Sequence, residues 1–278
     1  MDGEMNNDAA RTLLQWHLDA GADEAVGEMP IDHFTTPTPA PAPPRRQPPP
    51  QPAPAPAPSA APTSTRRSHQ TRPPPPTEPV LAARDRAASA KTLAELEELV
   101  RDFDGCPLKT TAKNTCFADG APDSGVMFIG EAPGRDEDLS GTPFVGRAGQ
   151  LLDKMLAAIG RSRTSAYITN IVYWRPPGNR TPTPAEAAIC RPFTERQIVL
   201  AKPDILVFLG GAAAKQMLDT STGIMRLRGK WTSYTPPGGT PIRAIATFHP
   251  AYLLRQPGQK KLAWRDFQAI RRALDEDS

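Results

Sequence analysis

The sequence has few cysteines and no long hydrophobic run. Only three of its 278 residues are cysteines, at Cys106, Cys116 and Cys190. An odd and widely spaced set does not suit a disulfide framework, so we expect these side chains to be small buried hydrophobes. No apolar run is long enough to span a bilayer, and the acidic start Met1-Asp2-Gly3-Glu4 lacks the apolar core of a signal peptide. We therefore expect a cytoplasmic protein without a membrane partner.

Proline, by contrast, is abundant and concentrated. More than half of the 34 prolines fall between Pro37 and Pro79. Such a stretch, mixed with Ala, Arg and Ser, buries too little apolar surface to offset its chain entropy. We therefore predict an acidic arm at residues 1–36, a disordered linker at residues 37–87 and one folded domain at residues 88–278, a normal size for a single core. If the domain is separate, deleting residues 1–87 leaves its activity intact.

The acidic arm contains a short amphipathic segment. Thr12 to Leu18 has the cap and apolar spacing of a helix, and eight Asp or Glu residues up to Asp32 stand against the single Arg11. A helix this short is marginal in water on its own. It is a candidate docking peptide for a protein partner, or it folds back on the domain. A bare disordered tail is the alternative.

The predicted domain alternates strands with helices. We expect a helix after the cap at Thr92, and parallel-type strands that read as continuous apolar runs. The expected strands lie at residues 126–129, 166–172, 204–209 and 242–247, and the expected helices at residues 92–100, 149–160, 184–200, 212–218 and 262–274. Repeated strand–helix units predict an α/β fold, a three-layer α/β/α sandwich around a short, mainly parallel sheet.

A glycine turn follows the first of these strands. Gly130-Glu131-Ala132-Pro133-Gly134 leads toward the helix, with Phe144 in between. Glycines before a helix can also cradle phosphates, but no Gly-Lys-Ser/Thr closes this loop and the spacing of a dinucleotide fingerprint is missing. The loop, the carboxylate and the aromatic side chain together favour a pocket for a flat, polar ring.

Three polar residues stand at the expected strand ends: Glu131, Asn170 and His249. Each has an ordinary explanation, as a solvated loop carboxylate, a strand-end amide or a structural histidine. Ligands of open α/β sheets bind at the carboxyl ends of the strands, however, where all three should meet beside Phe144. Their joint placement therefore predicts a functional site.

Several long blocks of the domain resemble the family 4 uracil-DNA glycosylases of bacteria and archaea. The blocks are the Gly130–Gly134 turn, Glu137-Asp138, Gly141–Leu152, Tyr167–Val172, Arg175–Arg180 and His249–Arg255. The resemblance spans about residues 103–274. It implies a uracil-DNA glycosylase-like fold and a monofunctional enzyme of base excision repair. Such an enzyme flips uracil out of single- or double-stranded DNA and hydrolyses its glycosidic bond, which leaves an abasic site. We expect a monomer.

The resemblance also implies roles for individual residues. His249 would donate a hydrogen bond to the leaving base, and Glu131 would position water or stabilise the cationic sugar, although the identity of the general base stays open. The remaining substrate-binding candidates are Gly130, Ala132, Pro133, Gly134, Phe144 as the stacking ring and Asn170 as the reader of the base edge. The DNA-binding candidates are Arg147, Leu253, Leu254 and Arg255. Packing of the two leucines into the core is the alternative to a wedge that enters the DNA.

The family typically carries a four-iron four-sulfur cluster on four cysteines, and here the sequence departs from it. Cys106 and Cys190 fall at two ligand positions, but Phe103 and Trp174 occupy the other two. Two thiolates cannot hold the cluster in the usual way. We therefore expect no cofactor, and we expect the two aromatic side chains to fill the vacated volume as a hydrophobic plug.

Two other functions remain open at this point. One is a non-catalytic protein that binds uracil-containing DNA or nucleic-acid ends. The other is a different α/β hydrolase resembling a nucleoside N-ribohydrolase, which is disfavoured because the usual acidic metal-binding cluster is not apparent. The modest excess of Lys and Arg in the domain is compatible with a phosphate backbone as partner but does not discriminate among these functions.

Overall fold

The computed structural model describes residues 77–276. By its contacts the chain divides into two units, Met1–His69 and Gln70–Ser278, and the described residues belong to the second. The expected acidic arm, its helix at Thr12–Leu18 and the linker up to residue 76 lie outside the described residues.

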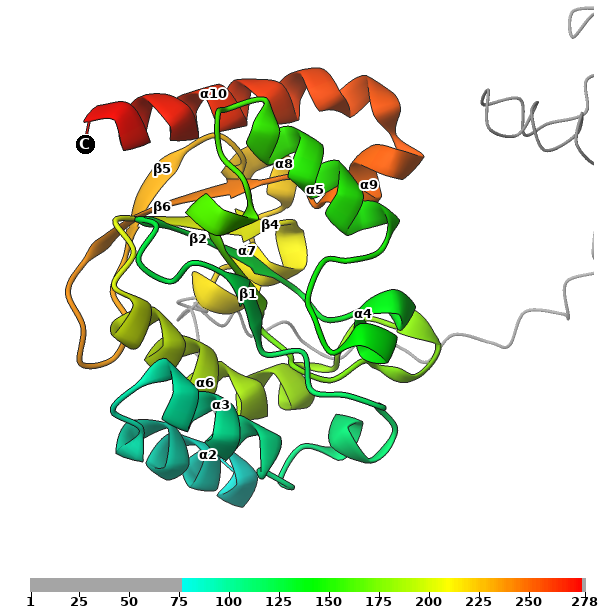
Figure 1. Cartoon of the computed structure of the whole chain (residues 1–278), viewed down its shortest axis with the longest axis vertical. Helices are drawn as coiled ribbons and strands as arrows, with labels where there is room; N and C mark the ends of the chain where they lie inside the picture. Colours follow the sequence, from blue (N-terminus) through cyan, green and yellow to red (C-terminus); the bar gives the residue numbers. More distant parts are fainter. Residues whose placement is uncertain (1–76, 277–278) are drawn as a thin grey trace, which may run out of the picture. The chain divides into compact units, whose positions relative to one another are not determined.

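The described residues form a six-stranded sheet in the order β1-β3-β2-β4-β6-β5 (Figure 1). The strands are β1 (Ala118–Gly120), β2 (Val126–Gly130), β3 (Tyr167–Asn170), β4 (Ile205–Leu209), β5 (Trp231–Tyr234) and β6 (Ile242–Thr247). Strands β3, β2, β4 and β6 pair in parallel, and the two edge strands β1 and β5 pair antiparallel. The sheet is therefore mainly parallel, as the sequence predicts.

Helices cover both faces of this sheet. They are α2 (Glu78–Ser89), α3 (Leu93–Arg101), α4 (Arg135–Ser140), α5 (Arg147–Ala157), α6 (Pro184–Ala201), α7 (Gly211–Met217), α8 (Ile224–Leu227), α9 (Pro250–Arg255) and α10 (Lys260–Glu276). Short 3-10 turns are η1 (Pro107–Thr110), η2 (Arg163–Ser165), η3 (Pro177–Asn179) and η4 (Pro257–Gln259). Among the described helices, none has the length and apolarity that crossing a membrane requires.

Successive side chains of each strand point to opposite faces of the sheet, so the core has two layers. In β2, Met127 and Ile129 pack into the layer with α2, α3, α6 and α7, whereas Val126 and Phe128 pack into the layer with α5 and α10. Figure 1 shows these two groups of helices on opposite sides of the sheet. All five residues of β2 and of β4 are buried, because both of their faces are covered. The predicted three-layer α/β/α sandwich is confirmed.

Local sequence signals set where the helices begin. Thr92 Oγ1 accepts a hydrogen bond from the Glu95 N–H (3.2 Å), as the expected cap of α3 requires. The Glu95 carboxylate accepts from the Lys91 N–H (2.6 Å) rather than from that of Thr92, so the capping box is not reciprocal. Helix α6 begins with a complete box between Thr183 and Glu186.

The predicted domain boundary at residue 88 is wrong by about ten residues. Helix α2 occupies Glu78–Ser89, and Ala83 and Ala87 are buried in the main core. The guanidinium of Arg196 on α6 donates to the carbonyl of Ala90, directly after α2. The proline-rich context of residues 78–87 predicts a linker, but these residues are part of the folded domain.

This correction predicts different outcomes for two truncations. Deleting residues 1–76 retains every contact described above, so we expect an unchanged free energy of unfolding. Deleting residues 1–87 removes all but the last two residues of α2 and uncovers apolar surface of α6, worth about 25 cal/mol per Å². We expect a loss of at least about 1 kcal/mol, or roughly 2–4 °C in Tm. Thermal denaturation followed by circular dichroism measures both, and equal Tm values for the two truncated proteins would contradict the assignment of α2 to the domain.

Candidate active site

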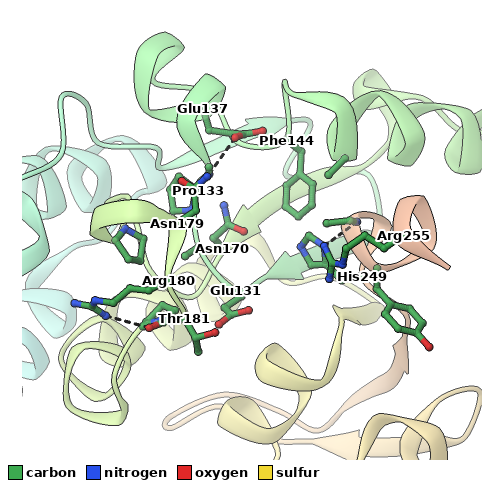
Figure 2. Close-up of a pocket in the computed structure, with 17 residues that line it drawn as sticks. Glu131, Pro133, Glu137, Phe144, Asn170, Asn179, Arg180, Thr181, His249 and Arg255 are labelled. Atoms are coloured by element: carbon green, nitrogen blue, oxygen red, sulfur yellow. Dashed lines mark hydrogen bonds between the residues drawn. The ribbon is translucent and has the colours of Figure 1, made fainter. Parts of the chain in front are cut away.

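The parallel register brings the polar strand ends together. Gly130 at the end of β2 pairs with Asn170 at the end of β3, and Leu209 at the end of β4 pairs with Thr247 at the end of β6. Glu131 follows β2 directly and His249 lies two residues after the end of β6, so both stand at this edge. Figure 2 shows Glu131, Asn170 and His249 around one cavity, with the ring of Phe144 beside them.

The cavity has a volume of about 450 Å³, which suits a small-molecule-sized group. Its lining includes most of the predicted site residues: Glu131, Ala132, Pro133, Gly134, Phe144, Asn170, His249 and Arg255. The lining residues that sequence reasoning did not nominate include Asn179, Arg180, Thr181 and Tyr252. Three of these four lie within the sequence blocks at residues 175–180 and 249–255 that carry the family resemblance. This resemblance was the signal that could have identified them.

The lack of a side chain at Gly130 leaves room for the side chains of Asn170 and Phe144. A Cβ atom at Gly130 would stand 2.4 Å from Asn170 Oδ1 and 2.5 Å from Phe144 Cζ. Both distances are shorter than real contacts allow, so any side chain there would push the amide and the ring apart. Glycine at this position is therefore a condition for placing Phe144 and Asn170 together.

The Glu137 carboxylate fixes the loop that carries Glu131. It accepts hydrogen bonds from the N–H of Gly134 (3.0 Å) and from the N–H of Gly146 (2.9 Å). Glu137 itself is only 8% exposed. Because Gly146 caps α5, this one side chain ties the glycine turn to the start of that helix.

Glu131 is a partly buried carboxylate without a full set of partners. No described residue donates a hydrogen bond to its Oε1 atom, which is inaccessible to solvent. Burial raises the pKa of Glu131 above its usual value of 4.5, and a hydrogen bond from Thr181 offsets part of this effect. When ionised, Glu131 is therefore a stronger base than a solvated glutamate.

His249 is held as a neutral donor. Its Nδ1 accepts a hydrogen bond from the Ala251 N–H (3.1 Å), because His249 caps α9. The proton of the neutral ring is therefore on Nε2. Burial, with a smaller contribution from the nearby cation Arg255, lowers the pKa of His249 to about 4. At neutral pH this ring offers an uncharged N–H to whatever occupies the cavity.

Asn170 offers an unused acceptor. The residue is 1% exposed, and no described group donates to its Oδ1 atom. A buried amide oxygen without a partner costs about 1–3 kcal/mol, so this position suits a ligand that donates a hydrogen bond. Beside it, the ring of Phe144 lies 5.6 Å from the imidazole of His249, centroid to centroid. The cavity thus combines a flat apolar surface with an acceptor and a donor.

The residues expected to touch DNA divide into two groups. Arg147, Leu254 and Arg255 are exposed, and Arg255 also lines the cavity. Leu253 is 1% exposed and packs with Phe248 and Ala263, so the expectation that it enters DNA is wrong. Successive helical residues point about 100° apart, and in α9 this turns Leu253 toward the core while leaving Leu254 37% exposed.

The side chains at the expected cluster position do not supply the four ligands that a four-iron four-sulfur cluster requires. Cys106 Sγ lies 3.9 Å from Cys190 Sγ, and both thiols are buried and free. The third thiol, Cys116, instead contacts the carbonyl of Glu137 (3.1 Å). Within residues 77–276 there is no group of three or more His, Cys, Asp or Glu side chains that could hold a metal ion.

Phe103 and Trp174 lie in the same core cluster as that cysteine pair. Phe103 packs edge-on against Phe193 of α6 at 5.1 Å, and it is 3% exposed. Trp174 is 1% exposed, and its Nε1–H donates to Thr115 Oγ1 (3.0 Å). Aromatic packing therefore holds together the loops and the helix that carry the two thiols.

Comparison with known proteins identifies uracil-DNA glycosylases as relatives of this chain. A family model described as the uracil DNA glycosylase superfamily matches residues 117–268. The type-4 uracil-DNA glycosylase of Thermotoga maritima is 42% identical over 166 residues, which are 58% of this chain and 82% of that protein. The type-4 enzyme of Archaeoglobus fulgidus is 40% identical over 64% of this chain and 92% of its own length. That of Pyrobaculum aerophilum is 38% identical over 66% and 97%.

The cysteine geometry predicts that anaerobically purified protein contains no stoichiometric iron or acid-labile sulfide. The variant Phe103→Cys/Trp174→Cys, which restores four thiols, is the matched control for cluster assembly during expression. Colorimetric iron and sulfide assays with the visible absorption spectrum measure both proteins. A stoichiometric cluster in the unmodified chain would contradict the aromatic plug.

The environment of His249 predicts its titration. Because its pKa is lowered to about 4, the ring stays neutral as the pH falls from 8 to about 5.5 and becomes charged only near pH 4. Replacing Arg255 with alanine removes a nearby cation, so the pKa should rise, but by less than the effect of burial. Nuclear magnetic resonance of labelled histidine measures both values and the Nε2–H tautomer. A pKa near 6.5 in the unmodified protein would refute this description.

Proposed function

Because the chain belongs to the uracil-DNA glycosylase superfamily, and within it to the type-4 uracil-DNA glycosylases, we propose that its cavity excises uracil from DNA. The enzyme hydrolyses the N-glycosidic bond and leaves an abasic site, the first step of base excision repair. The observation that carries the proposal is the meeting of two unpartnered buried oxygens, an aromatic ring and a neutral imidazole N–H in one cavity.

Base recognition rests on Asn170 and Phe144. Uracil has a donor at N3 and an acceptor at O4, which match the Oδ1 and Nδ2 atoms of one side-chain amide. With the amide in this orientation, cytosine, which has no proton at N3 and carries an amino group at C4, would leave the buried oxygen of Asn170 unpaired. That penalty is on the order of a few kcal/mol. Phe144 stacks on the flipped base, whichever base it is, and therefore supplies affinity rather than discrimination.

Bond cleavage uses His249 and Glu131. As the C1′–N1 bond breaks, its electron pair moves to uracil and positive charge develops on the sugar. The Nε2–H of His249 donates to O2 of the departing uracil anion, where charge appears only in the transition state. Glu131 stabilises the cation and accepts a proton from the water whose oxygen bonds to C1′. Uracil takes up a proton at N1 after departure, and the sugar–phosphate chain stays uncut.

The DNA contacts follow from what is exposed around the cavity. Leu254 is the apolar side chain placed to fill the gap left by the flipped nucleotide, and Arg255 beside it can hold a phosphate. Arg147 stands at the first turn of α5, where a cation and free backbone N–H groups favour an anion.

The enzyme works without an iron–sulfur cluster. Hydrolysis of a glycosidic bond requires a positioned water, a base and a leaving-group donor, and the chain supplies groups for each of these tasks. The aromatic residues Phe103 and Trp174 perform the packing that orders the neighbouring loops.

One experiment separates the candidate activities. The full-length chain is incubated with single-stranded uracil DNA, double-stranded uracil DNA and free deoxyuridine, and free uracil is assayed. Release from DNA alone is expected. Binding without release would instead identify a non-catalytic uracil-DNA binding protein, and release from free deoxyuridine would identify a nucleoside N-ribohydrolase-like hydrolase.

Substitution of residues at the site should slow uracil release without unfolding the protein. His249→Asn and Asn170→Leu should each lower the single-turnover rate of uracil release by about 10²–10³, the scale of losing one transition-state donor or base-reading group. Gln268→Leu, which removes an amide from α10 outside the cavity, is the matched control and should keep the rate. Tm values within about 3 °C of the unmodified protein show that folding is retained. Rates within threefold of the unmodified protein would rule out the assigned roles.

A further inference from the structure

Phe144 has an unusual backbone conformation. Its φ is +57°, in the left-handed region that bulky residues rarely adopt. Such a conformation is strained and persists only where the surroundings determine it. The strain lies at the residue whose ring is proposed to stack on uracil, so the groups that hold this backbone also determine where the ring stands.

One of these groups is the first turn of α5. A Cβ atom at Gly149 would lie 1.6 Å from the carbonyl oxygen of Phe144. That oxygen therefore occupies the space of the missing side chain. The contact limits how far the loop can approach the helix, but it does not hold the carbonyl in place.

Arg163 provides the hydrogen bonds that hold this loop in place. It lies in η2, on the connection from α5 to β3, and its Nη1 donates to the carbonyl of Pro143 (3.2 Å). Its Nη2 donates to the carbonyl of Phe144 itself. One guanidinium thus binds the two successive carbonyls that frame the left-handed turn.

The guanidinium is in turn fixed by two carboxylates. Its Nη1 pairs with Asp119 on β1 (2.5 Å), and its Nε pairs with Asp153 on α5 (2.8 Å). The side chain of Arg163 is 25% exposed, so the geometry is partly shielded from water. This set of contacts needs several donors in a planar fork, which arginine has and lysine lacks.

We propose that Arg163 is a positioning residue for uracil recognition, acting through the backbone of Phe144. Arg163 is not among the residues that line the cavity. Its effect passes to the ring, which packs over Gly130 and beside His249. The inference rests on the proposed function, because it assumes that Phe144 stacks on the base. Under this proposal, part of the affinity for uracil depends on the ion pairs of Arg163 with Asp119 and Asp153, outside the residues that line the cavity.

The test is the affinity for free uracil. Arg163→Lys keeps the charge but not the fork, and it should raise the Ki of free uracil in the DNA assay about tenfold, with a matching rise in KM for uracil DNA. Arg161→Lys makes the same change two residues away and is the matched control, with an unchanged Ki. Tm is measured for each variant. An unchanged Ki for Arg163→Lys would overturn the proposal.

A second comparison excludes a merely structural effect. In a Phe144→Ala background the stacking ring is gone, so adding Arg163→Lys should change the Ki by less than about twofold. A loss of general packing would instead give the same tenfold change in both backgrounds, and that result would also overturn the proposal.

If Arg163→Lys does not fold, Asp153→Asn takes its place. Asp153 is 44% exposed, and the change leaves Arg163 its other partners. A smaller rise in Ki, again only when Phe144 is present, is expected; no rise would refute the proposal. Absence of uracil release by the unmodified protein would refute the proposed function instead, so the two failures are distinguishable.

Discussion

The parallel pairing of β3, β2, β4 and β6 is the constraint on which the site depends. Parallel strands all end at the same edge of a sheet, so residues far apart in the chain reach one place there. Gly130 pairs with Asn170, and the strand that ends at Thr247 delivers His249 two residues later. Both faces of these strands are covered by helices, and a slip by one residue would move each side chain into the other packed layer, where it would not fit its neighbours, so the register is fixed. The pocket is thus a consequence of the core.

Burial then sets the chemistry of the pocket. It disfavours charge, so it lowers the pKa of His249 and raises that of Glu131. The same burial leaves oxygens of Glu131 and Asn170 without partners among the described residues. The unpartnered oxygens and the left-handed backbone of Phe144 are unfavourable in the protein alone, and under the proposed function the two oxygens would gain partners when uracil and water bind. The rest of the domain, with its packed aromatic and aliphatic core, tolerates this cost.

Some elements could be predicted from the sequence and others could not, for identifiable reasons. The strands β2 and β4 are continuous apolar runs, and a cap marks the start of α3, so their existence follows from local pattern. The fully buried residues of α2 are alanines, with the partly buried Val80 beside them, and the helix begins among prolines, so its apolar pattern is weak. Leu253 and Leu254 are neighbours of the same type, and only the rotation of α9 decides which one is buried.

By itself the sequence determined the fold class, the family and the residue types at the strand ends, because hydrophobic pattern and contiguous motifs are local properties of the chain. The tertiary structure decided what those residues are able to do. The tautomer of His249 follows from the Ala251 N–H that it accepts, and its pKa follows from the atoms packed around it. The contact between Arg163 and Phe144 joins residues on different segments. Burial, hydrogen-bond partners and electrostatic fields depend on neighbours in space, which no local pattern specifies.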